Sequence, residues 1–349
     1  MASDESDAAT APTSTMFREG GEAAAAVARQ EANGDALNRI GAALRRLSPP
    51  VVITCARGSS DHAATFAKYA IETRIGIPVA SAAPSVASVY ASSLRAEGAL
   101  CIAISQSGRS PDLLATVTSL KESGAWVLAL VNDAASPLAD LADEAVDLAA
   151  GPERSVAATK SFIASLTAIA RVIAEWRDDE ALRGDLRQLP DLLKRSWQLD
   201  WSPLTTGLSS ARDLYVLGRG LGFGIGQEAA LKLKETSQLH AEAFSTAELR
   251  HGPMALVRPG FPVLMFGQSD DTRENVEQTA RLLVERGARV FLTGAEAPGA
   301  TTLPSIGCAP LLEPILQIQA FYRAAEALAV ARGLDPDRPP HLAKVTETR

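Results

Sequence analysis

Hydroxyl side chains gather where two apolar runs of the sequence end. The run 99–105 (ALCIAIS) is followed by the segment 106–110 (QSGRS), and the run 51–56 (VVITCA) by the segment 57–60 (RGSS). A buried strand that ends in hydroxyls and a glycine, just before a helix, presents backbone N–H and O–H groups to an anion, so that no lysine is needed. The first loop offers three hydroxyls, on Ser105, Ser107 and Ser110.

The same loop has a simpler explanation as the start of a helix. Ser110 or Asp112 can cap the helix that follows, because both side chains accept hydrogen bonds from the first free N–H groups. The second hydroxyl loop favours the binding interpretation. Neighbouring parallel strands would bring both loops to one carboxyl edge of a sheet, where ligands of α/β proteins bind. The sequence therefore predicts a phosphorylated ligand at that edge.

Three charged residues share one face of a predicted helix. Glu228, Lys232 and Glu235 follow one another at intervals of four and three residues, a spacing that aligns side chains along a helix. A solvated ladder of salt bridges has the same pattern. However, His240 and His251 follow closely, and histidine exchanges protons near neutral pH. A metal site is not predicted, because neither HExxH spacing nor a fourth ligand set occurs.

These residues are embedded in alternating strand and helix patterns. The runs 51–56, 99–105 and 126–131 predict buried strands with helices between them. Such alternation predicts a parallel sheet covered by helices on both faces. A second set of strand-like runs covers 213–218, 261–267 and 288–294.

The two sets of strands repeat one another. A shift of about 162 positions places Arg57-Gly58 on Arg219-Gly220 and Gln106-Ser107 on Gln268-Ser269 without a gap. Gly124-Ala125 then meets Gly287-Ala288 after a slip of one residue. We therefore expect an internal duplication into two α/β subdomains. The stretch 159–208 predicts long bridging helices, and a last helix is expected over about 314–332.

Composition argues against several classes of protein. Of 349 residues, 46% are hydrophobic, which is enough for two domains, and 41 acidic against 34 basic residues with no basic stripe disfavour a nucleic-acid partner. The three cysteines include no CxxC pair, so we expect a cytoplasmic protein without disulfides. No apolar run approaches the roughly 18 residues of a membrane span, and no membrane partner is expected. The acidic start predicts a disordered tail rather than a secretion signal.

Six motifs, in order along the chain, resemble the isomerase half of glutamine–fructose-6-phosphate aminotransferase. They are SQSGRSPD (105–112), VAATKSF (156–162), EAALKLKE (228–235), HAEAF (240–244), ELRHGP (248–253) and HLAK (341–344). The resemblance spans roughly residues 15 to 349. It implies an α/β fold of two sugar isomerase (SIS) subdomains, each a parallel sheet flanked by helices in three αβα layers, similar to flavodoxin.

The resemblance also implies roles for individual residues. Glu235 matches the proton-transfer carboxylate, His251 the ring-opening histidine and Lys344 the C-terminal catalytic lysine. Glu228 and Lys232 are expected in the same pocket. The phosphate-binding residues match Ser60, Ser105, Gln106, Ser107 and Ser110, and Val156 and Ala158 are expected beside the sugar.

Two departures from the family pattern affect the sugar contacts. The family often has serine where Ala158 stands. The residues before the lysine read Pro339-Pro340-His341 rather than an arginine–asparagine pair. We therefore expect contacts to the sugar that differ from those of the aminotransferase.

The implied reaction follows from a third departure. The aminotransferases carry an N-terminal glutaminase domain, whereas this sequence begins with Met1 and an acidic segment, so glutamine is not expected to supply ammonia. Chains of two SIS subdomains are similar to isomerase-type glucosamine-6-phosphate deaminases. The resemblance then implies conversion of glucosamine 6-phosphate to fructose 6-phosphate and ammonia by C1–C2 proton transfer, without metal or organic cofactor.

Other functions stay open at this point. A fructosamine-6-phosphate deglycase or a simple aldose–ketose phosphosugar isomerase would use the same residues. A non-enzymatic sugar-phosphate sensor would need a DNA-binding module, for which the roughly 45 residues before the first strand leave little room.

The expected organisation has five parts and a partner copy. They are a disordered tail (1–14), an N-terminal helical segment (15–48), a first SIS subdomain with linking helices (49–197), a second SIS subdomain (198–333) and a catalytic tail (334–349). The resemblance implies a homodimer that shares its active sites, with a hexosamine 6-phosphate as ligand.

Overall fold

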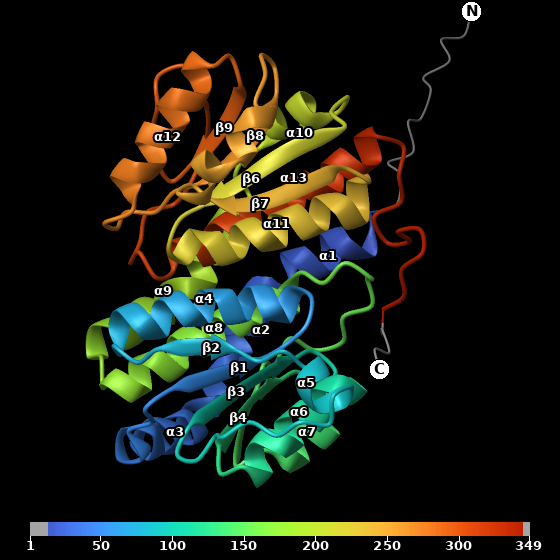
Figure 1. Cartoon of the computed structure of the whole chain (residues 1–349). Helices are drawn as coiled ribbons and strands as arrows, with labels where there is room; N and C mark the ends of the chain where they lie inside the picture. The colour runs from blue at the N-terminus through green and yellow to red at the C-terminus, as the bar shows by residue number, and fades with distance from the viewer. Residues whose placement is uncertain (1–12, 345–349) are drawn as a thin grey trace, which may run out of the picture.

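The computed structural model describes residues 13–344, so most of the expected N-terminal tail and the last five residues of the catalytic tail lie outside the described part. The chain forms two α/β halves, one above the other in Figure 1. Each half contains one five-stranded parallel sheet with helices on both faces. The predicted α/β fold of two subdomains, each a parallel sheet flanked by helices, is confirmed.

The first sheet contains β1 to β5 in the order β2-β1-β3-β4-β5. This is the flavodoxin-like order, in which the chain reverses direction across the sheet between β1 and β3. The strands are β1 (Val52–Cys55), β2 (Val79–Ser81), β3 (Leu100–Ser105), β4 (Trp126–Val131) and β5 (Glu144–Asp147).

The second sheet repeats that order as β10-β9-β8-β6-β7. Its strands are β6 (Asp213–Gly218), β7 (His240–Ser245), β8 (Pro262–Phe266), β9 (Arg289–Thr293) and β10 (Thr301–Leu303). All six strand-like runs of the sequence form strands. The other four strands have three to six residues each and lie at the outer edges of their sheets, where half-polar runs such as HAEAFS lack the apolar pattern of a central strand.

One pair of glycines supports the duplication in backbone detail. Gly58 and Gly220, which the shift of about 162 places together, have φ/ψ values of 55°/−132° and 57°/−128°. This region of conformational space is open essentially to glycine alone. In both halves the glycine turns the chain from the first strand into the following helix, α4 (Ser59–Arg74) or α11 (Leu221–Ser237).

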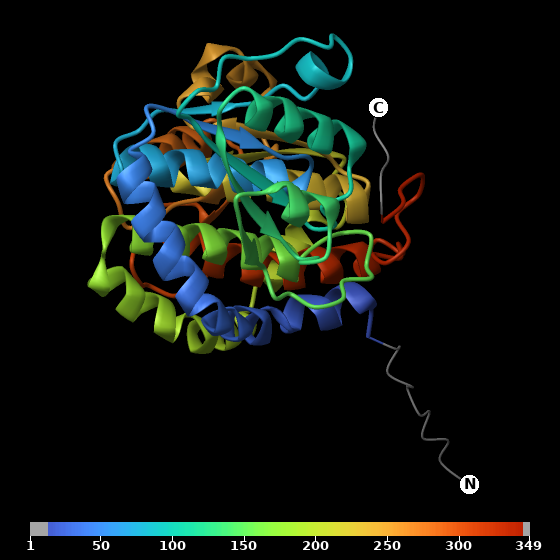
Figure 2. The same ribbon diagram turned by 90° about the horizontal axis from the view of Figure 1, so that it is seen from below.

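Four helices join the halves. α4 packs against α11, and α8 (Lys160–Arg177) and α13 (Glu313–Ala331) lie in the interior beside them (Figures 1 and 2). α8 is buried on nearly every side, and its buried residues include both apolar side chains and polar ones such as Lys160 and Arg171, which form ion pairs with Glu22 and Glu31. Side chains of both halves belong to one continuous apolar core.

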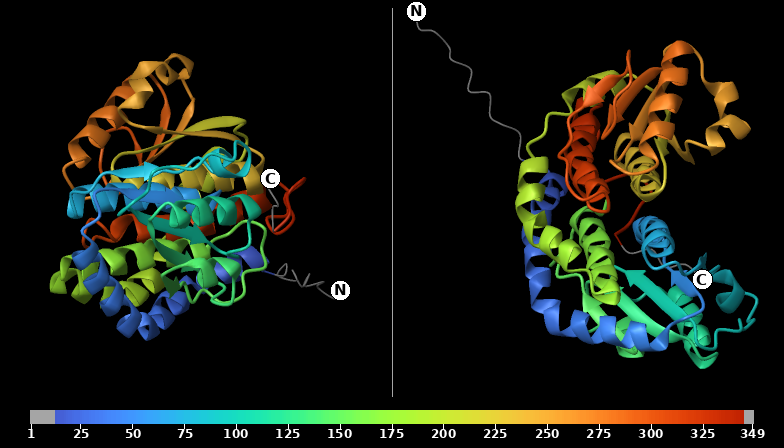
Figure 3. Two further views of the ribbon diagram at one scale, coloured as in Figure 1. Left: turned by 60° about the horizontal axis from the view of Figure 1, so that its bottom comes forward. Right: turned by 90° about the vertical axis from the view of Figure 1, so that its left-hand side faces the viewer.

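The remaining helices cover the outside. α1 (Thr15–Gly21), α2 (Ala23–Arg29) and α3 (Gly34–Leu47) run along one side of the molecule past both halves (Figure 3). The expected bridging helices after Thr159 are α8, α9 (Glu180–Ser196) and α10 (Ser202–Leu208). The other elements are α5 (Ser85–Ser88), α6 (Pro111–Glu122), α7 (Pro137–Leu141), α12 (Arg273–Glu285) and the 3-10 helices η1 (Gln30–Asn33), η2 (Glu248–His251) and η3 (Pro253–Leu256).

Candidate functional site

A cavity of about 430 Å³ opens at the carboxyl edge of the first sheet, beside the ends of β1 and β3. In this strand order the crevice between those two strands is the usual ligand site. All of the predicted phosphate-binding residues line it, and so do Val156 and Ala158. The polar and catalytic candidates on its wall are Ser60, Ser105, Gln106, Ser107, Ser110, Glu235 and Lys344.

The loop after β3 is held open toward the cavity. Ser105 Oγ accepts a hydrogen bond from Gly108 N–H at 2.9 Å, which folds the loop back on the strand end. Gly108 has a φ of 65°, and a Cβ there would lie 2.3 Å from Ser136 Oγ, so only glycine fits. Ser110 precedes α6 without any side-chain capping bond. The capping alternative for Ser110 is therefore not realised, and its hydroxyl is left for a ligand.

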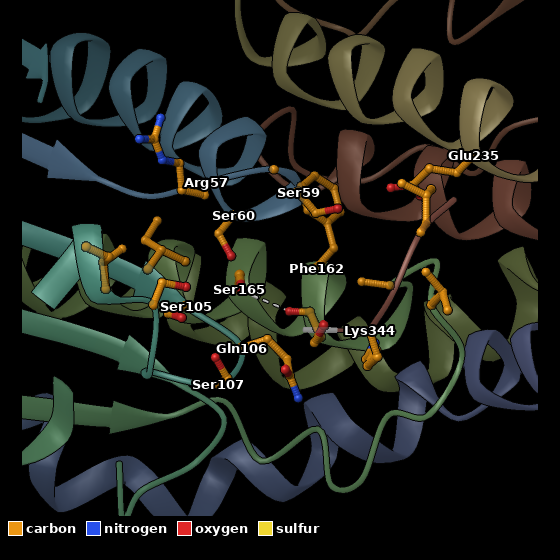
Figure 4. Close-up of a pocket in the computed structure, with 18 of the residues that line it drawn as sticks. Arg57, Ser59, Ser60, Ser105, Gln106, Ser107, Phe162, Ser165, Glu235 and Lys344 are labelled. Carbon is orange, nitrogen blue, oxygen red and sulfur yellow. Dashed lines mark hydrogen bonds between the residues drawn. The ribbon is translucent and has the colours of Figure 1, made fainter. Parts of the chain in front are cut away.

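Arg57 forms the rim of this cavity. Its Nε and Nη2 donate to Asp112 Oδ2 at 2.9 and 2.7 Å, and the Asp112 carboxyl is buried. The ion pair ties the loop after β1 to the first turn of α6. The two hydroxyl loops are thus fixed relative to each other, as a phosphate cradle requires (Figure 4).

Glu235 faces the cavity from the side opposite the cradle (Figure 4). It extends from α11, and its Oε2 accepts a hydrogen bond from Lys232 Nζ at 2.5 Å. Lys232 is also 3.4 Å from Glu228 Oε1. The three residues form the row expected from their helical spacing, but Lys232 and Glu228 are buried behind Glu235 rather than exposed on the cavity wall. The solvated-ladder alternative is wrong.

Glu228 has further partners that the sequence did not reveal. Its carboxylate accepts hydrogen bonds from Ser59 Oγ at 3.1 Å and Tyr322 OH at 3.0 Å, and His62 Nδ1 lies at 2.9 Å. Burial by itself would raise the pKa of Glu228, but Lys232 and the hydrogen bond from His62 outweigh it and hold that pKa below its usual range.

The pKa values of Lys232 and Tyr322 both depend on the same carboxylates. Burial opposes the charge on Lys232, yet Glu228 and Glu235 raise its pKa above the ordinary value. Burial and Glu228 raise the pKa of Tyr322 well above its usual value, which keeps the phenol protonated as a donor. The row therefore contains one ammonium shared between two carboxylates.

Lys344, near the C-terminus, is paired at the cavity with a second carboxylate that the sequence did not reveal. Lys344 Nζ lies 3.4 Å from Glu153 Oε2. Glu153 is buried and also accepts from Thr159 N, Ser161 N and Ser161 Oγ. Burial acts to raise the pKa of Glu153, but Lys344 and these donors lower it overall. Its position just before the VAATK motif was the only sequence signal for it.

His251 is not brought to this cavity by its own chain. It ends η2, in the second half, is exposed, and does not line the cavity. The adjoining η3 exposes Leu256, whose surface is 58% accessible. Of the three predicted catalytic residues, the structure therefore brings Glu235 and Lys344 together and leaves His251 apart.

The matching loop of the second half binds a carboxylate of its own chain. Ser269, the counterpart of Ser107, donates from its N–H and its Oγ to the two carboxylate oxygens of Glu313, both at 2.7 Å. Gln268, the counterpart of Gln106, is buried and donates to Arg219 O and Thr272 Oγ1. A carboxylate thus takes the position that an anion would need in this loop, and a cavity of about 450 Å³ adjoins Ser269 and Glu313.

No group of three or more His, Cys, Asp or Glu side chains within residues 13–344 is arranged to hold a metal ion. Within the same residues, every helix is too short or too polar to cross a bilayer.

Comparisons with known proteins agree with this architecture. The SIS domain model matches residues 49–174 and 207–296. The chain is 33% identical to glutamine–fructose-6-phosphate aminotransferase (isomerizing) of Sulfurisphaera tokodaii over 302 residues, which are 84% of this chain and 49% of that protein. It therefore spans about half the length of this curated relative.

Two solved structures are also similar. One is a candidate phosphosugar isomerase from Silicibacter pomeroyi, 43% identical with a TM-score of 0.90, covering 93% of this chain and 100% of that one. The other is the C-terminal domain of glucosamine-fructose-6-phosphate aminotransferase from Francisella tularensis, 25% identical with a TM-score of 0.84, covering 97% and 100%.

Proposed function

Because the chain belongs to the SIS domain family and is homologous to the isomerase portion of glutamine–fructose-6-phosphate aminotransferase, we propose that it converts glucosamine 6-phosphate to fructose 6-phosphate and ammonia. One observation carries the proposal. A hydroxyl cradle and a lysine-paired carboxylate face each other across a single cavity of about 430 Å³. That is the arrangement needed to anchor a phosphate at one end of a sugar and move a proton at the other.

Binding begins with the phosphate in the cradle of Ser60, Ser105, Ser107 and Ser110. These hydroxyls and the nearby backbone N–H groups supply the donors, so that the phosphate can be held without a lysine in the loop. Anchoring the 6-phosphate places C1 and C2 of the open-chain sugar toward Glu235, and this fixed orientation accounts for much of the rate enhancement. Val156 and Ala158 then lie beside the sugar.

The proton transfer uses Glu235 as the base. In the open-chain aldehyde the C2–H is acidic, and the Glu235 carboxylate takes that proton and returns it to C1. The intermediate is an enolamine with a C1–C2 double bond, in which O1 has gained a proton. When C1 is protonated, the C2 amine gives up a proton, so that a ketimine forms at C2 and a hydroxymethyl group at C1. Water then adds to the ketimine, and ammonia leaves to give fructose 6-phosphate. The hydrogen bond from Lys232 to Oε2 of Glu235 holds the carboxylate in place for the first step.

Ring opening needs a group that exchanges protons near neutral pH, as histidine does, and none of the described residues that line the cavity is a histidine. We assign it to His251 of a second copy in a homodimer, because His251 is exposed beside the accessible Leu256. Lys344 then contacts the open-chain carbonyl.

The proposed organisation of the chain is as expected from the sequence. The two subdomains cover 49–197 and 198–333, the catalytic tail covers 334–349, and the protein acts in the cytoplasm.

The test is ammonia release from a panel of sugar phosphates. We expect glucosamine 6-phosphate to give equal amounts of ammonia and fructose 6-phosphate in the presence of a chelator. Release from fructosamine 6-phosphates alone would identify a deglycase, and interconversion of aldose and ketose phosphates without ammonia would identify a simple isomerase. Activity only in the presence of glutamine, or with none of these sugars, would refute the proposal.

A further inference from the structure

His62 lies at the outer end of the buried charge row. It belongs to the first turn of α4, in the first half of the chain, whereas Glu228 belongs to α11 in the second half. His62 Nδ1 is 2.9 Å from Glu228 Oε2, and the side chains are 18% and 0% exposed. His62 does not line the substrate cavity. Its contact therefore connects the surface to the row that ends at Glu235.

Glu228 depends on donors from three helices. On α4 these are Ser59 and His62, on α13 the Tyr322 hydroxyl, and on α11 itself the Lys232 ammonium. The other charges that act on this group are the carboxylates of Glu235 and Glu153. Because Glu228 is acceptor-only when ionised, His62 Nδ1 must carry the hydrogen of this bond. A buried carboxylate that loses one donor becomes much harder to keep ionised.

Building on the proposed function, we propose that His62 is a positioning residue for the proton-transfer step, which holds Glu228 ionised so that Lys232 stays fixed on Glu235. Lys232 Nζ is 2.5 Å from Glu235 Oε2 and 3.4 Å from Glu228 Oε1, so it is held between two anchors. If His62 no longer donates, Glu228 has two ways to respond. Glu228 draws the Lys232 ammonium toward itself, or it takes up a proton and no longer holds that ammonium. Either response alters the position and charge around Glu235.

The kinetic test compares three variants. His62→Leu removes the donor and keeps an apolar side chain, whereas His62→Asn offers an amide N–H to Glu228. Thr65→Ala, one turn further along α4, removes only a hydroxyl bonded to Asp61 O and is the control. Since hydrogen bonds to charged groups are among the stronger ones, we expect kcat to fall roughly tenfold in His62→Leu. KM should stay near the wild-type value, and His62→Asn should recover most of kcat.

The pH dependence of kcat is a second readout, and it would not change if His62 only stabilised the fold. In His62→Leu, Glu228 binds a proton more readily, so the acidic limb of the kcat profile should move to higher pH. The acidic limb of Thr65→Ala should lie at the same pH as that of the wild-type protein, and the limb of His62→Asn should move back toward the wild-type pH. A lower melting temperature with unchanged kcat and pH profile would overturn the inference, as would a His62→Asn variant no better than His62→Leu.

A second measurement separates this inference from the proposed function. Carboxyl ¹³C NMR of glutamate-labelled protein, with the Glu228 signal assigned from Glu228→Gln, follows the ionisation of Glu228 without any substrate. We expect its titration to shift upward in His62→Leu and to return in His62→Asn. An unchanged titration would refute the role of His62 whatever the substrate is. If the wild-type protein turns over no sugar phosphate, the proposed function fails while the titration still shows whether His62 controls Glu228.

Discussion

Glu235 meets the requirements of a base that works next to a negatively charged substrate. Its side chain is 16% exposed, so one oxygen can reach a ligand while the other is bonded to Lys232. The hydrogen bond from the Lys232 ammonium restrains the carboxylate in one orientation. A base that is already oriented needs little reorganisation when the sugar arrives.

The residue-scale prediction is that Glu235→Gln keeps substrate binding and loses proton transfer. The amide has the same shape but cannot accept the C2 proton, so turnover should fall on the order of 10²-fold or more while KM changes little. The measurement is deuterium incorporation at C1 of the product in D₂O. Glu285→Gln, at the exposed end of α12, is the control. Near-normal incorporation in Glu235→Gln would assign the base to another residue.

The C-terminal tail shows how an element without regular structure is held over a site. Asp337 accepts hydrogen bonds from Thr15 N and Met16 N at 2.6 and 2.8 Å, so it caps α1. Beyond it, Leu342, Ala343 and Lys344 line the cavity. The tail thus has an anchor on α1 that is separate from its end at the cavity.

The element-scale prediction follows from that division. Deleting residues 340–349 should abolish turnover and leave the melting temperature nearly unchanged, because the Asp337 anchor remains. Asp337→Ala is the matched variant, and the loss of a helix cap should lower stability by about 1 kcal/mol. Steady-state kinetics and thermal unfolding of both variants show whether the end of the tail acts in turnover and Asp337 in stability. Unchanged kinetics after the deletion would show that Lys344 has no catalytic role.

At the scale of the whole molecule, the two halves share a fold but differ in what occupies the cradle. We expect Ser107→Ala to raise KM for the phosphosugar roughly tenfold, since a hydrogen bond to a charged group is lost. Ser269→Ala, its counterpart, should leave KM unchanged and lower the melting temperature, because its hydroxyl bonds Glu313. Calorimetry should find one phosphosugar per chain. Two bound per chain, or equal effects on KM, would contradict the asymmetry.

The second prediction at this scale concerns the dimer. If Glu235 and His251 of one site come from different copies, a heterodimer of His251→Ala and Glu235→Gln chains contains one intact and one doubly defective site. Isolated through two affinity tags, it should recover activity that neither parent homodimer has. A heterodimer as inactive as its parents, or a fully active monomer, would refute the shared site.

The sequence by itself was enough to predict the two parallel sheets and the hydroxyl cradle. Central strands are apolar along their whole length, and the segments that follow them must lie at the carboxyl edge, so Ser105 and Ser107 could be placed without coordinates. The spacing of Glu228, Lys232 and Glu235 likewise determined a common face, since those contacts lie within one helix. In each case the interacting residues are close in sequence or related by a regular topology.

Only the tertiary structure decided which side chains complete those groups. His62, Tyr322 and Glu228 meet because α4, α11 and α13 pack together, across sequence separations of 166 and 94 residues. The same holds for Lys344 with Glu153, and for Ser269 with Glu313, whose carboxylate occupies the second cradle. Long-range pairs of this kind depend on helix packing and side-chain direction rather than on local periodicity. For that reason two loops matched by the repeat differ, one open to a ligand and the other occupied by a carboxylate of its own chain.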